Sequence, residues 1–340
     1  MCLYKKFYEA KRLNFLEILI ANIWKLRSFL SLLLTIGVFF ALIKFIGSHN
    51  LITTFKAIKL KYALMALFLS LIFPFLGALR WHWVLKATGQ TISILNCLIL
   101  TMGAWPINAF LPSRTGDFIR VAFLGKDTSK TKAFGSIIAE KILDVACLAL
   151  IGLLGAIGIK DKKFAMIFLV ILMILIIISS QGLSFSERWL KNKKSKILKN
   201  VNLTMQGMNI LSSCPKSCAI ATIWAFINWS LSVVQVLLFF KAFGTYVHPL
   251  EISARLPLSI FIGILPITLA GMGTRDAAML YFFKEFAPAS TIFGVAIFYT
   301  LYSYFLYALL GLPFFIYLTN RNELSLKKDY NNYFINTFPK

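Results

Sequence analysis

The chain has 340 residues, of which 59% are apolar and only 14% are charged, and its mean hydropathy is +0.76. This balance excludes a water-soluble globular domain. The net charge of +23 would suit a nucleic-acid partner, but the Lys and Arg residues lie mostly between apolar segments rather than among polar neighbours. The composition therefore predicts an all-α polytopic membrane protein whose basic residues meet lipid headgroups, with no nucleic-acid partner.

Residues 1–28 form a basic segment that precedes any long apolar run, which argues against a cleaved signal peptide and for a cytoplasmic N-terminus. Six later stretches reach the roughly 20 apolar residues that a helix needs to cross a bilayer. We expect these full crossings at residues 29–47, 62–80, 134–159, 164–182, 217–241 and 291–318. The predicted membrane domain thus covers residues 29–318, with a basic cytoplasmic loop at 183–216 and a cytoplasmic tail at 319–340.

Two further apolar stretches, residues 94–111 and 252–283, are interrupted by Pro and Gly near their middles. If the first of them crossed the membrane, the basic N-terminal segment and the basic loop would lie on opposite sides, against the positive-inside rule. We therefore expect the first stretch to be re-entrant, and the part of the second around residues 257–273 to be re-entrant from the opposite face, which also leaves the C-terminus cytoplasmic. Such segments line cavities, and one in each half of the chain indicates a possible inverted repeat.

The first interrupted stretch leads into a charged motif. Pro112 and Gly116 break the helix there. Arg114, Asp117 and Arg120 follow at spacings of three, which places them on one face of a restarting helix. Two arginines suit bidentate recognition of a phosphate, with Asp117 orienting one of them. The alternative is an ion pair in a loop at the membrane surface.

The second interrupted stretch carries a similar motif. Pro266, Gly271 and Gly273 loosen the backbone, and Arg275 and Asp276 begin the next helix. A helix N-terminus attracts anions, and charged residues in an apolar region need to pair or to line water. The alternative here is a structural ion pair that locks the two halves together.

A third motif begins an otherwise apolar helix, where Glu140 and Asp144 lie four residues apart on one face. Two carboxylates facing lipid would be penalised, so we expect them to face the interior. Their partners would be Lys141, Arg114 or Arg120, or they would couple to a proton or a cation.

No metal site, catalytic triad or nucleotide-binding loop is indicated. The three histidines share no spacing and the five cysteines are scattered. We therefore expect no metal and no cofactor, assign no catalytic residue, and favour a transporter or lipid-handling protein over an enzyme.

At these motifs the sequence resembles the flippase-like family typified by the transmembrane region of lysylphosphatidylglycerol synthase. The segment from Leu111 to Asp117 with Arg120 is similar to its Pro-x-x-x-Gly-Glu motif, and Glu140-Lys-Ile-Leu-Asp144 to its Glu-Arg-x-x-Asp motif. Gly271-Met-Gly-Thr-Arg-Asp276 is similar to its Gly-x-Gly-x-Arg-Glu motif. Asp for Glu, and Lys141 for Arg, keep the charge but change its reach, which bears on substrate geometry.

The resemblance covers nearly the whole chain and implies the lipid-handling half of such proteins. The aminoacyl-transferring members carry a soluble catalytic domain after the membrane region, whereas this sequence ends about twenty residues past its last predicted span. The family and the basic loops favour the bacterial cytoplasmic (inner) membrane.

Three hypotheses follow. The first is a lipid flippase that binds the anionic headgroup of a phospholipid or a polyprenyl-linked glycan between two pseudo-symmetric halves. The second is a membrane-embedded transferase on a lipid-linked substrate, with a carboxylate as general base, and the third is a noncatalytic protein that presents lipid to an envelope-biosynthesis enzyme. The substrate-binding residues of the first hypothesis are Arg114, Asp117, Arg120, Glu140, Asp144, Arg275 and Asp276.

Overall fold

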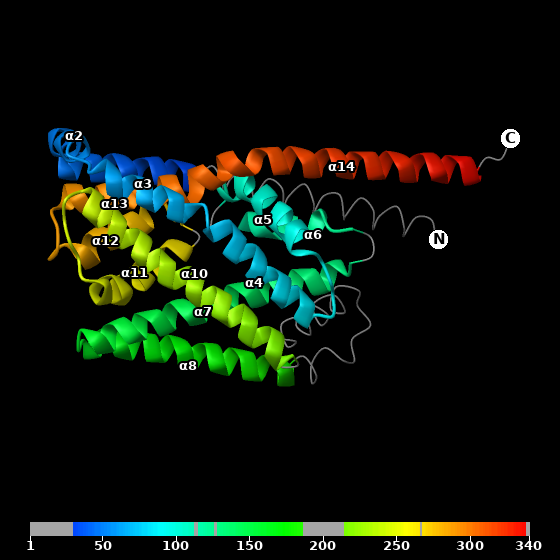
Figure 1. Cartoon of the computed structure of the whole chain (residues 1–340), viewed down its shortest axis with the longest axis horizontal. Helices are drawn as coiled ribbons and strands as arrows, with labels where there is room; N and C mark the ends of the chain where they lie inside the picture. The colour runs from blue at the N-terminus through cyan, green and yellow to red at the C-terminus, as the bar shows by residue number, and fades with distance from the viewer. Residues whose placement is uncertain (1–29, 112–114, 126–127, 186–213, 266, 338–340) are drawn as a thin grey trace, which may run out of the picture.

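The computed structural model describes residues 30–111, 115–125, 128–185, 214–265 and 267–337. Every regular element within these ranges is a helix, and most of the long helices run roughly along the long axis of the molecule (Figure 1). The described part of the chain is therefore all-α, as the composition predicted.

The first half of the chain contains one helix at Leu30–Ile46 followed by α2 (Ser48–Lys56), α3 (Leu60–Ser70), α4 (Phe73–Ala87), α5 (Ile94–Asn108), the 3-10 turn η1 (Thr115–Phe118), α6 (Ile119–Ala122) and α7 (Lys130–Gly158). The second half contains α8 (Lys162–Phe185), α10 (Pro215–Ala242), α11 (Pro249–Ile264), α12 (Thr274–Phe283), α13 (Ala289–Thr300), the π-helical turn η3 (Leu301–Phe305) and α14 (Leu306–Thr337).

Local sequence explains several helix ends. The Ser93 side chain accepts a hydrogen bond from the backbone N–H of Asn96 at 3.2 Å and caps α5. Pro215 and Pro249 occupy the first positions of α10 and α11, where a missing N–H costs no helical hydrogen bond. These signals fix where the helices begin.

Three described helices are long and apolar enough to cross a membrane, namely Leu60–Ala87, Pro215–Ala242 and Ala289–Arg321. The bent pair Leu30–Ile46 and Ser48–Lys56, with an angle of 84° between its helices, makes a fourth if it counts as one span. Helices α7 and α8 cover the stretches predicted at residues 134–159 and 164–182 and have 29 and 24 residues. The membrane-spanning character is thus confirmed, and the count of six crossings stays a prediction.

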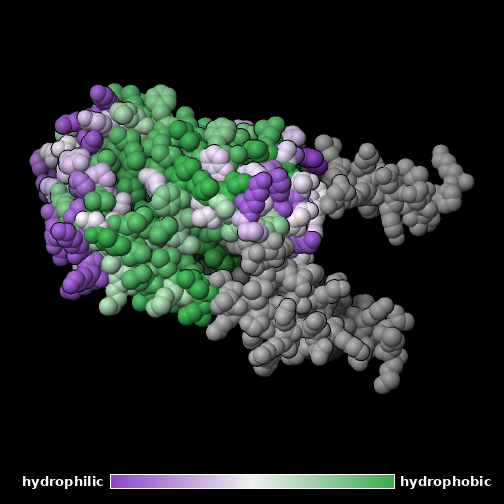
Figure 2. All heavy atoms as spheres, turned by 60° about the horizontal axis from the view of Figure 1, so that its bottom comes forward, coloured by the Kyte–Doolittle hydropathy of each residue, from purple (hydrophilic) through white to green (hydrophobic). Residues whose placement is uncertain are grey.

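Large apolar side chains cover much of the outside. Figure 2 shows a broad hydrophobic band across the middle of one face, with hydrophilic residues gathered at both ends of the band. The exposed side chains include Phe40, Phe45, Phe68, Met166 and Leu309, each at least 66% accessible. A surface of this kind suits lipid tails rather than water.

The first interrupted stretch differs from its prediction in one respect. The prediction that the helix breaks near the middle of this stretch was wrong, because α5 continues through Pro106 and ends at Asn108. Pro106 has no N–H for the carbonyl of Met102, and that carbonyl lies against Gly311 of the neighbouring α14. Close packing against another helix therefore accommodates the proline, and the true break follows the helix.

The last helix also departs from the predicted boundary. The final span was expected to end at residue 318, with a tail beyond it. Instead α14 continues to Thr337. The polar residues after Leu318 thus extend the helix of the last span.

Helix α10 lies at the centre of the fold and packs against α3, α4, α7, α11 and α13. On one side of it α5 packs against α4 and α14, and on the other side α11 packs against α7 and α12. Figure 1 shows α5 and α6 toward one end of the molecule and α11 and α12 toward the other. The first interrupted stretch thus leads into the helix pair α5 and α6, and the second forms the helix pair α11 and α12. We call these the two interrupted pairs.

Candidate functional site

In the first interrupted pair, the 3-10 turn η1 packs closely against the end of α5. A Cβ atom on Gly116 would lie 2.8 Å from the backbone nitrogen of Asn108, so only glycine allows this approach. The next residue, Asp117, accepts a hydrogen bond from Nδ2 of Asn108 at 2.8 Å. The turn therefore places a carboxylate directly at the break between α5 and α6.

Asp117 is held by two cations. Nζ of Lys141 on α7 donates to its Oδ2, and Nη2 of Arg120 on α6 lies 3.4 Å from the same oxygen. Nε of Arg120 also donates to the backbone carbonyl of Asp117 at 3.1 Å, and its guanidinium lies over the Trp81 ring at 4.6 Å. Asp117 and Arg120 are thus in contact, as their spacing predicted.

The cluster continues across the bundle to α4. Nη2 of Arg120 lies 3.1 Å from Oε2 of Glu140, and Nη2 of Arg80 lies 2.5 Å from Oε1 of the same carboxylate. Nη1 of Arg80 reaches Oδ1 of Asp144 at 2.5 Å, and the indole N–H of Trp229 donates to that oxygen at 2.8 Å. Arg80 therefore bridges two carboxylates that lie one turn apart on α7.

We call this continuous set of ion pairs the charged ladder, which consists of Lys141, Asp117, Arg120, Glu140, Arg80 and Asp144 in order of contact. Its three cations and three anions alternate, so the ladder carries no net charge. Arg120 and Glu140 are only 1% and 2% exposed. Such residues are costly inside a membrane unless they pair, and pairing on this scale marks a candidate functional site.

The second interrupted pair also has a glycine at the turn between its two helices. Gly271 has φ of +73°, and a Cβ atom there would lie 2.5 Å from the carbonyl oxygen of Gly263 on α11. The chain then starts α12, where Oδ2 of Asp276 accepts the backbone N–H of Gly273 at 2.9 Å. Asp276 therefore caps its own helix.

The cation of this turn is almost fully buried. Arg275 is 2% exposed, and its Nη2 lies 2.6 Å from Oδ1 of Asp276 and donates to the Thr300 hydroxyl of α13. The guanidinium also lies over the rings of Tyr299 and Tyr304, at 4.6 and 5.6 Å. Arg275 is thus fixed by two charged or polar partners and two aromatic faces.

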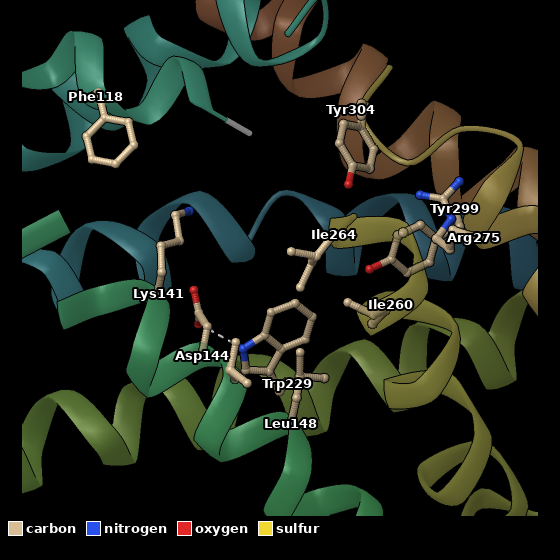
Figure 3. A pocket seen from close by; sticks show the side chains of 13 residues that line it. Phe118, Lys141, Asp144, Leu148, Trp229, Ile260, Ile264, Arg275, Tyr299 and Tyr304 are labelled. Atoms are coloured by element: carbon tan, nitrogen blue, oxygen red, sulfur yellow. Dashed lines mark hydrogen bonds between the residues drawn. The ribbon is translucent and has the colours of Figure 1, made fainter. Parts of the chain in front are cut away.

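An apolar cavity of about 170 Å³ separates the ladder from Arg275. Lys141 and Asp144 lie at one end of it, and Arg275 lies at the other end beside Tyr299 and Tyr304 (Figure 3). The walls between these ends come mostly from apolar side chains, including Phe118, Val145, Leu148, Ile260 and Ile264. The cavity therefore joins both interrupted helix pairs.

Two smaller cavities adjoin it. A charged cavity of about 70 Å³ is lined by Arg80, Asp117, Arg120 and Glu140, and a neutral polar cavity of about 50 Å³ is lined by Asn228, Ser232, Gln235 and Ser303. Trp229 lines all three cavities. The three spaces therefore surround one indole ring in the centre of the bundle.

Two guanidinium nitrogens at these cavities lack a hydrogen-bond partner within the described part of the chain. They are Nη1 of Arg120 and Nη1 of Arg275, both on side chains that are at least 98% buried. An unsatisfied donor on a buried cation is costly, and an anionic oxygen would satisfy it.

The predicted site residues fall into two groups. The structure brings Asp117, Arg120, Glu140 and Asp144 together in the ladder. Arg275 and Asp276 form a separate ion pair, and Arg275 shares the apolar cavity with Asp144. Arg114, Pro112 and Pro266 lie outside the described residues. Gly116, Gly271 and Gly273 lie in the turns that were predicted to break the helices.

The sequence interpretation missed Arg80 and Trp229. Arg80 was taken as the end of the span at residues 62–80, but the helix continues to Ala87. Because the residues after Arg80 include Trp81, Val84 and Leu85, the charge interrupts an apolar run rather than ending it. A lone arginine inside such a run is itself a functional signal. Trp229 carries no comparable signal, because its role depends on the fold.

These features define an integral membrane protein with a buried, charge-paired cavity between two broken helix pairs. The chain belongs to the lysylphosphatidylglycerol synthase TM region family, whose model matches residues 28–311. This match confirms the resemblance seen in the motifs.

Two archaeal relatives carry the description UPF0104 membrane protein. One from Methanocaldococcus jannaschii is 23% identical over 315 residues, which covers 85% of this chain and 93% of the relative. The other, from Methanothermobacter thermautotrophicus, is 23% identical over 298 residues, covering 78% and 88%. These similarities extend along most of each chain, so they concern the membrane domain as a whole.

Proposed function

We propose that this protein moves a lipid with an anionic headgroup between leaflets, with the headgroup bound in the cavities around Trp229. The observation that carries this proposal is the apolar cavity with Lys141 and Asp144 at one end and Arg275 at the other. An amphiphile needs both features, because its phosphate seeks cationic donors while its acyl region seeks an apolar surface.

The carboxylates support binding rather than proton transfer. Glu140 is in contact with two arginines, Asp117 with Lys141 and Arg120, and Asp144 with Arg80 and Trp229. A carboxylate engaged in this way orients cations but is a poor acceptor for a substrate proton. This arrangement favours the flippase over the transferase hypothesis.

The packing of the two halves supports alternating access by pseudo-symmetric units. Helices Leu60–Ala87 and α10 each have 28 residues, and each is followed by an interrupted pair and then by a long helix. The first interrupted helix, α5, packs on the last long helix, α14, and its counterpart α11 packs on α7. Exchanging the halves therefore preserves these contacts, as expected for an inverted repeat.

The membrane in which this occurs is part of the proposal. We propose that the interrupted pairs are re-entrant and that both termini are cytoplasmic, since this orientation places most Lys and Arg residues on one side. The relatives described above are archaeal, so the transport assay should include archaeal as well as bacterial lipids.

The proposal is tested by translocation of acyl-labelled anionic lipids in proteoliposomes that contain wild type, Arg275→Lys or Arg120→Gln protein. Both substitutions remove guanidinium donors, so we expect translocation to fall roughly tenfold to a hundredfold, the value of one charge-assisted hydrogen bond. Arg255→Gln is the matched control, because Arg255 pairs with Glu251 on α11 and lines none of the three cavities.

Equal insertion and an unchanged elution volume in detergent must accompany each rate. If the folded wild type moves none of the anionic lipids, the flippase proposal is wrong. The presenting role would then be examined by copurification with envelope enzymes.

A further inference from the structure

The polar side chains of the neutral polar cavity have no assigned role in the proposed function, which was argued from the charged residues and the apolar walls alone. Its polar lining comes from α10, which contributes Asn228, Ser232 and Gln235, and from Ser303 in the π-helical turn η3. The first three recur at intervals of four and three residues and so form one polar stripe on a membrane helix. A π-helical turn is rare and frequently marks a functional site.

Three of these side chains are buried, Asn228 is partly exposed, and the four form few hydrogen bonds. Ser232, Gln235 and Ser303 are 4%, 1% and 7% exposed. Within the described residues no side-chain hydrogen bond is formed by Asn228, Ser232 or Ser303, although Thr222 on the same helix bonds the carbonyl of Cys218 at 2.9 Å. Gln235 uses its amide nitrogen to bind Ser70 at 2.7 Å, which leaves its carbonyl oxygen. The stripe thus presents donors and acceptors to the cavity, where a ligand can use them.

The chemistry of the lining selects among headgroups. Amide and hydroxyl groups both donate and accept hydrogen bonds, which matches the hydroxyl groups of a polyol or sugar. No carboxylate lines this cavity in the described part of the chain, and the carboxylates of the charged cavity already hold cations. An amine-bearing headgroup would therefore find no free counter-charge.

The neutral polar cavity adjoins both of the other cavities. It shares Trp229, Asn228 and Tyr307 with the charged cavity, where Nη1 of Arg120 lacks a partner, and it shares Trp229 and Tyr299 with the apolar cavity. A phosphate held by Arg120 in the charged cavity would thus place its ester substituent beside the stripe. The volume of about 50 Å³ admits about four water-sized groups, on the scale of a small polyol or part of a sugar ring.

We propose that Asn228, Ser232, Gln235 and Ser303 form a hydroxyl-recognition subsite, so that the lipid carried is a phosphate ester of a polyol or sugar rather than of an amine. This inference rests on the proposed function, since it places the headgroup in the same cavities. It adds the residues that determine specificity and the chemical class of the headgroup.

The test is competitive lipid binding to detergent-solubilised protein, measured by native mass spectrometry, which does not require translocation. Phosphatidylinositol, phosphatidylglycerol, phosphatidic acid and phosphatidylethanolamine with identical acyl chains are supplied at equal concentrations. We expect the two hydroxylated lipids to bind about tenfold more than phosphatidic acid, which corresponds to one or two neutral hydrogen bonds. Phosphatidylethanolamine should bind no better than phosphatidic acid.

The variant is Ser232→Ala combined with Ser303→Ala, two positions that line the neutral polar cavity and neither of the other two. It should bring the ratio of hydroxylated lipid to phosphatidic acid near one while the binding of phosphatidic acid stays unchanged. Ser230→Ala is the matched control, since Ser230 lies on the same helix and lines none of the cavities. Arg275→Lys should instead lower the binding of all the anionic lipids together.

Equal binding of all four lipids by the wild type, or a preference that the double variant retains, would overturn the subsite. Displacement of bound lipid by soluble inositol 1-phosphate would overturn the assignment to a lipid and point to a free phosphate ester. A hydroxyl preference without any translocation would uphold the subsite while refuting the flippase proposal, so the two failures are distinguishable.

Discussion

Arg80 holds two carboxylates that would otherwise face each other one turn apart on α7. It contacts Glu140 and Asp144, both at 2.5 Å, and no other described cation contacts Asp144. Paired charges of this kind contribute little net stability compared with apolar residues of the same shape, but removing one partner leaves an uncompensated buried charge. The residue therefore decides whether the ladder is tolerated in the bundle.

Arg80→Met should lower the free energy of unfolding by about 3–5 kcal/mol, because it leaves Asp144 without a cationic partner. The measurement is equilibrium unfolding in detergent micelles, followed by tryptophan fluorescence. Lys86→Met on the same helix is the control, because Lys86 is exposed and, within the described part of the chain, contacts the Trp83 ring rather than a carboxylate. Adding Asp144→Asn to Arg80→Met should recover part of the loss, because it removes the unpaired charge. Equal stability of Arg80→Met and wild type would contradict this role.

Trp229→Phe should keep the aromatic wall shared by the three cavities but lose the N–H bond to Asp144. The freed carboxylate oxygen would then repel an anionic headgroup, and we expect lipid translocation to fall roughly tenfold with a stability loss of about 1 kcal/mol. Trp224→Phe on the same helix is the comparison, since Trp224 lines none of the cavities. Equal transport rates for the two variants would argue against a headgroup beside Trp229.

At the scale of elements, the two glycine turns position the charges. Gly116 brings Asp117 against the end of α5, and Gly271 brings the start of α12 against α11. Neither position has room for a side chain. Each glycine turn therefore ends one helix and places the charged residue that follows it at a cavity.

Gly271→Ala should destabilise the fold by more than about 2 kcal/mol and displace Arg275, because its φ is +73° and the new methyl group would meet the Gly263 carbonyl at 2.5 Å. Unfolding in detergent and the binding of an anionic lipid are the two readouts. Gly37→Ala provides the comparison, since Gly37 lies inside a helix and a Cβ atom there would meet nothing within 4 Å. An unchanged Gly271→Ala protein would show that the turn relaxes without disturbing the site.

Most helices could be predicted from the lengths of apolar runs, because a bilayer demands that length from any sequence. The prediction was wrong at Pro106, whose cost is offset by a contact with α14 that no local pattern encodes. For the site, the motif charges were recognisable because charges inside apolar sequence are rare. The pairing of these charges could not be predicted, because Arg80 contacts Glu140 and Asp144, which lie 60 and 64 positions later in the sequence.

At the scale of the whole molecule, the interrupted pairs decide the topology. If α5 and α6 return to the side from which they enter, the residues before and after them share that side. The same holds for α11 and α12 at the other end of the molecule. The arrangement of every other helix in the membrane follows from these two alternatives.

Single cysteines at Lys86, Lys130, Tyr246 and Lys284, in a background without the five native cysteines, should report these sides. All four positions are exposed. We expect Lys86→Cys and Lys130→Cys to react with a membrane-impermeant maleimide from the cytoplasmic side, and Tyr246→Cys and Lys284→Cys from the opposite side. Labelling of Lys86→Cys and Lys130→Cys from different sides would mean that α5 and α6 together cross the membrane.

The charge balance of the site has an electrical consequence. The ladder contains three cations and three anions, and Arg275 is matched by Asp276, so these residues together are neutral. A neutral empty site reorients without moving charge, whereas the loaded site carries the charge of its anionic lipid. Transport would then be electrogenic, with the bilayer voltage contributing about 2.3 kcal/mol per charge for each 100 mV. An inside-negative potential would drive the lipid toward the outer leaflet without ATP.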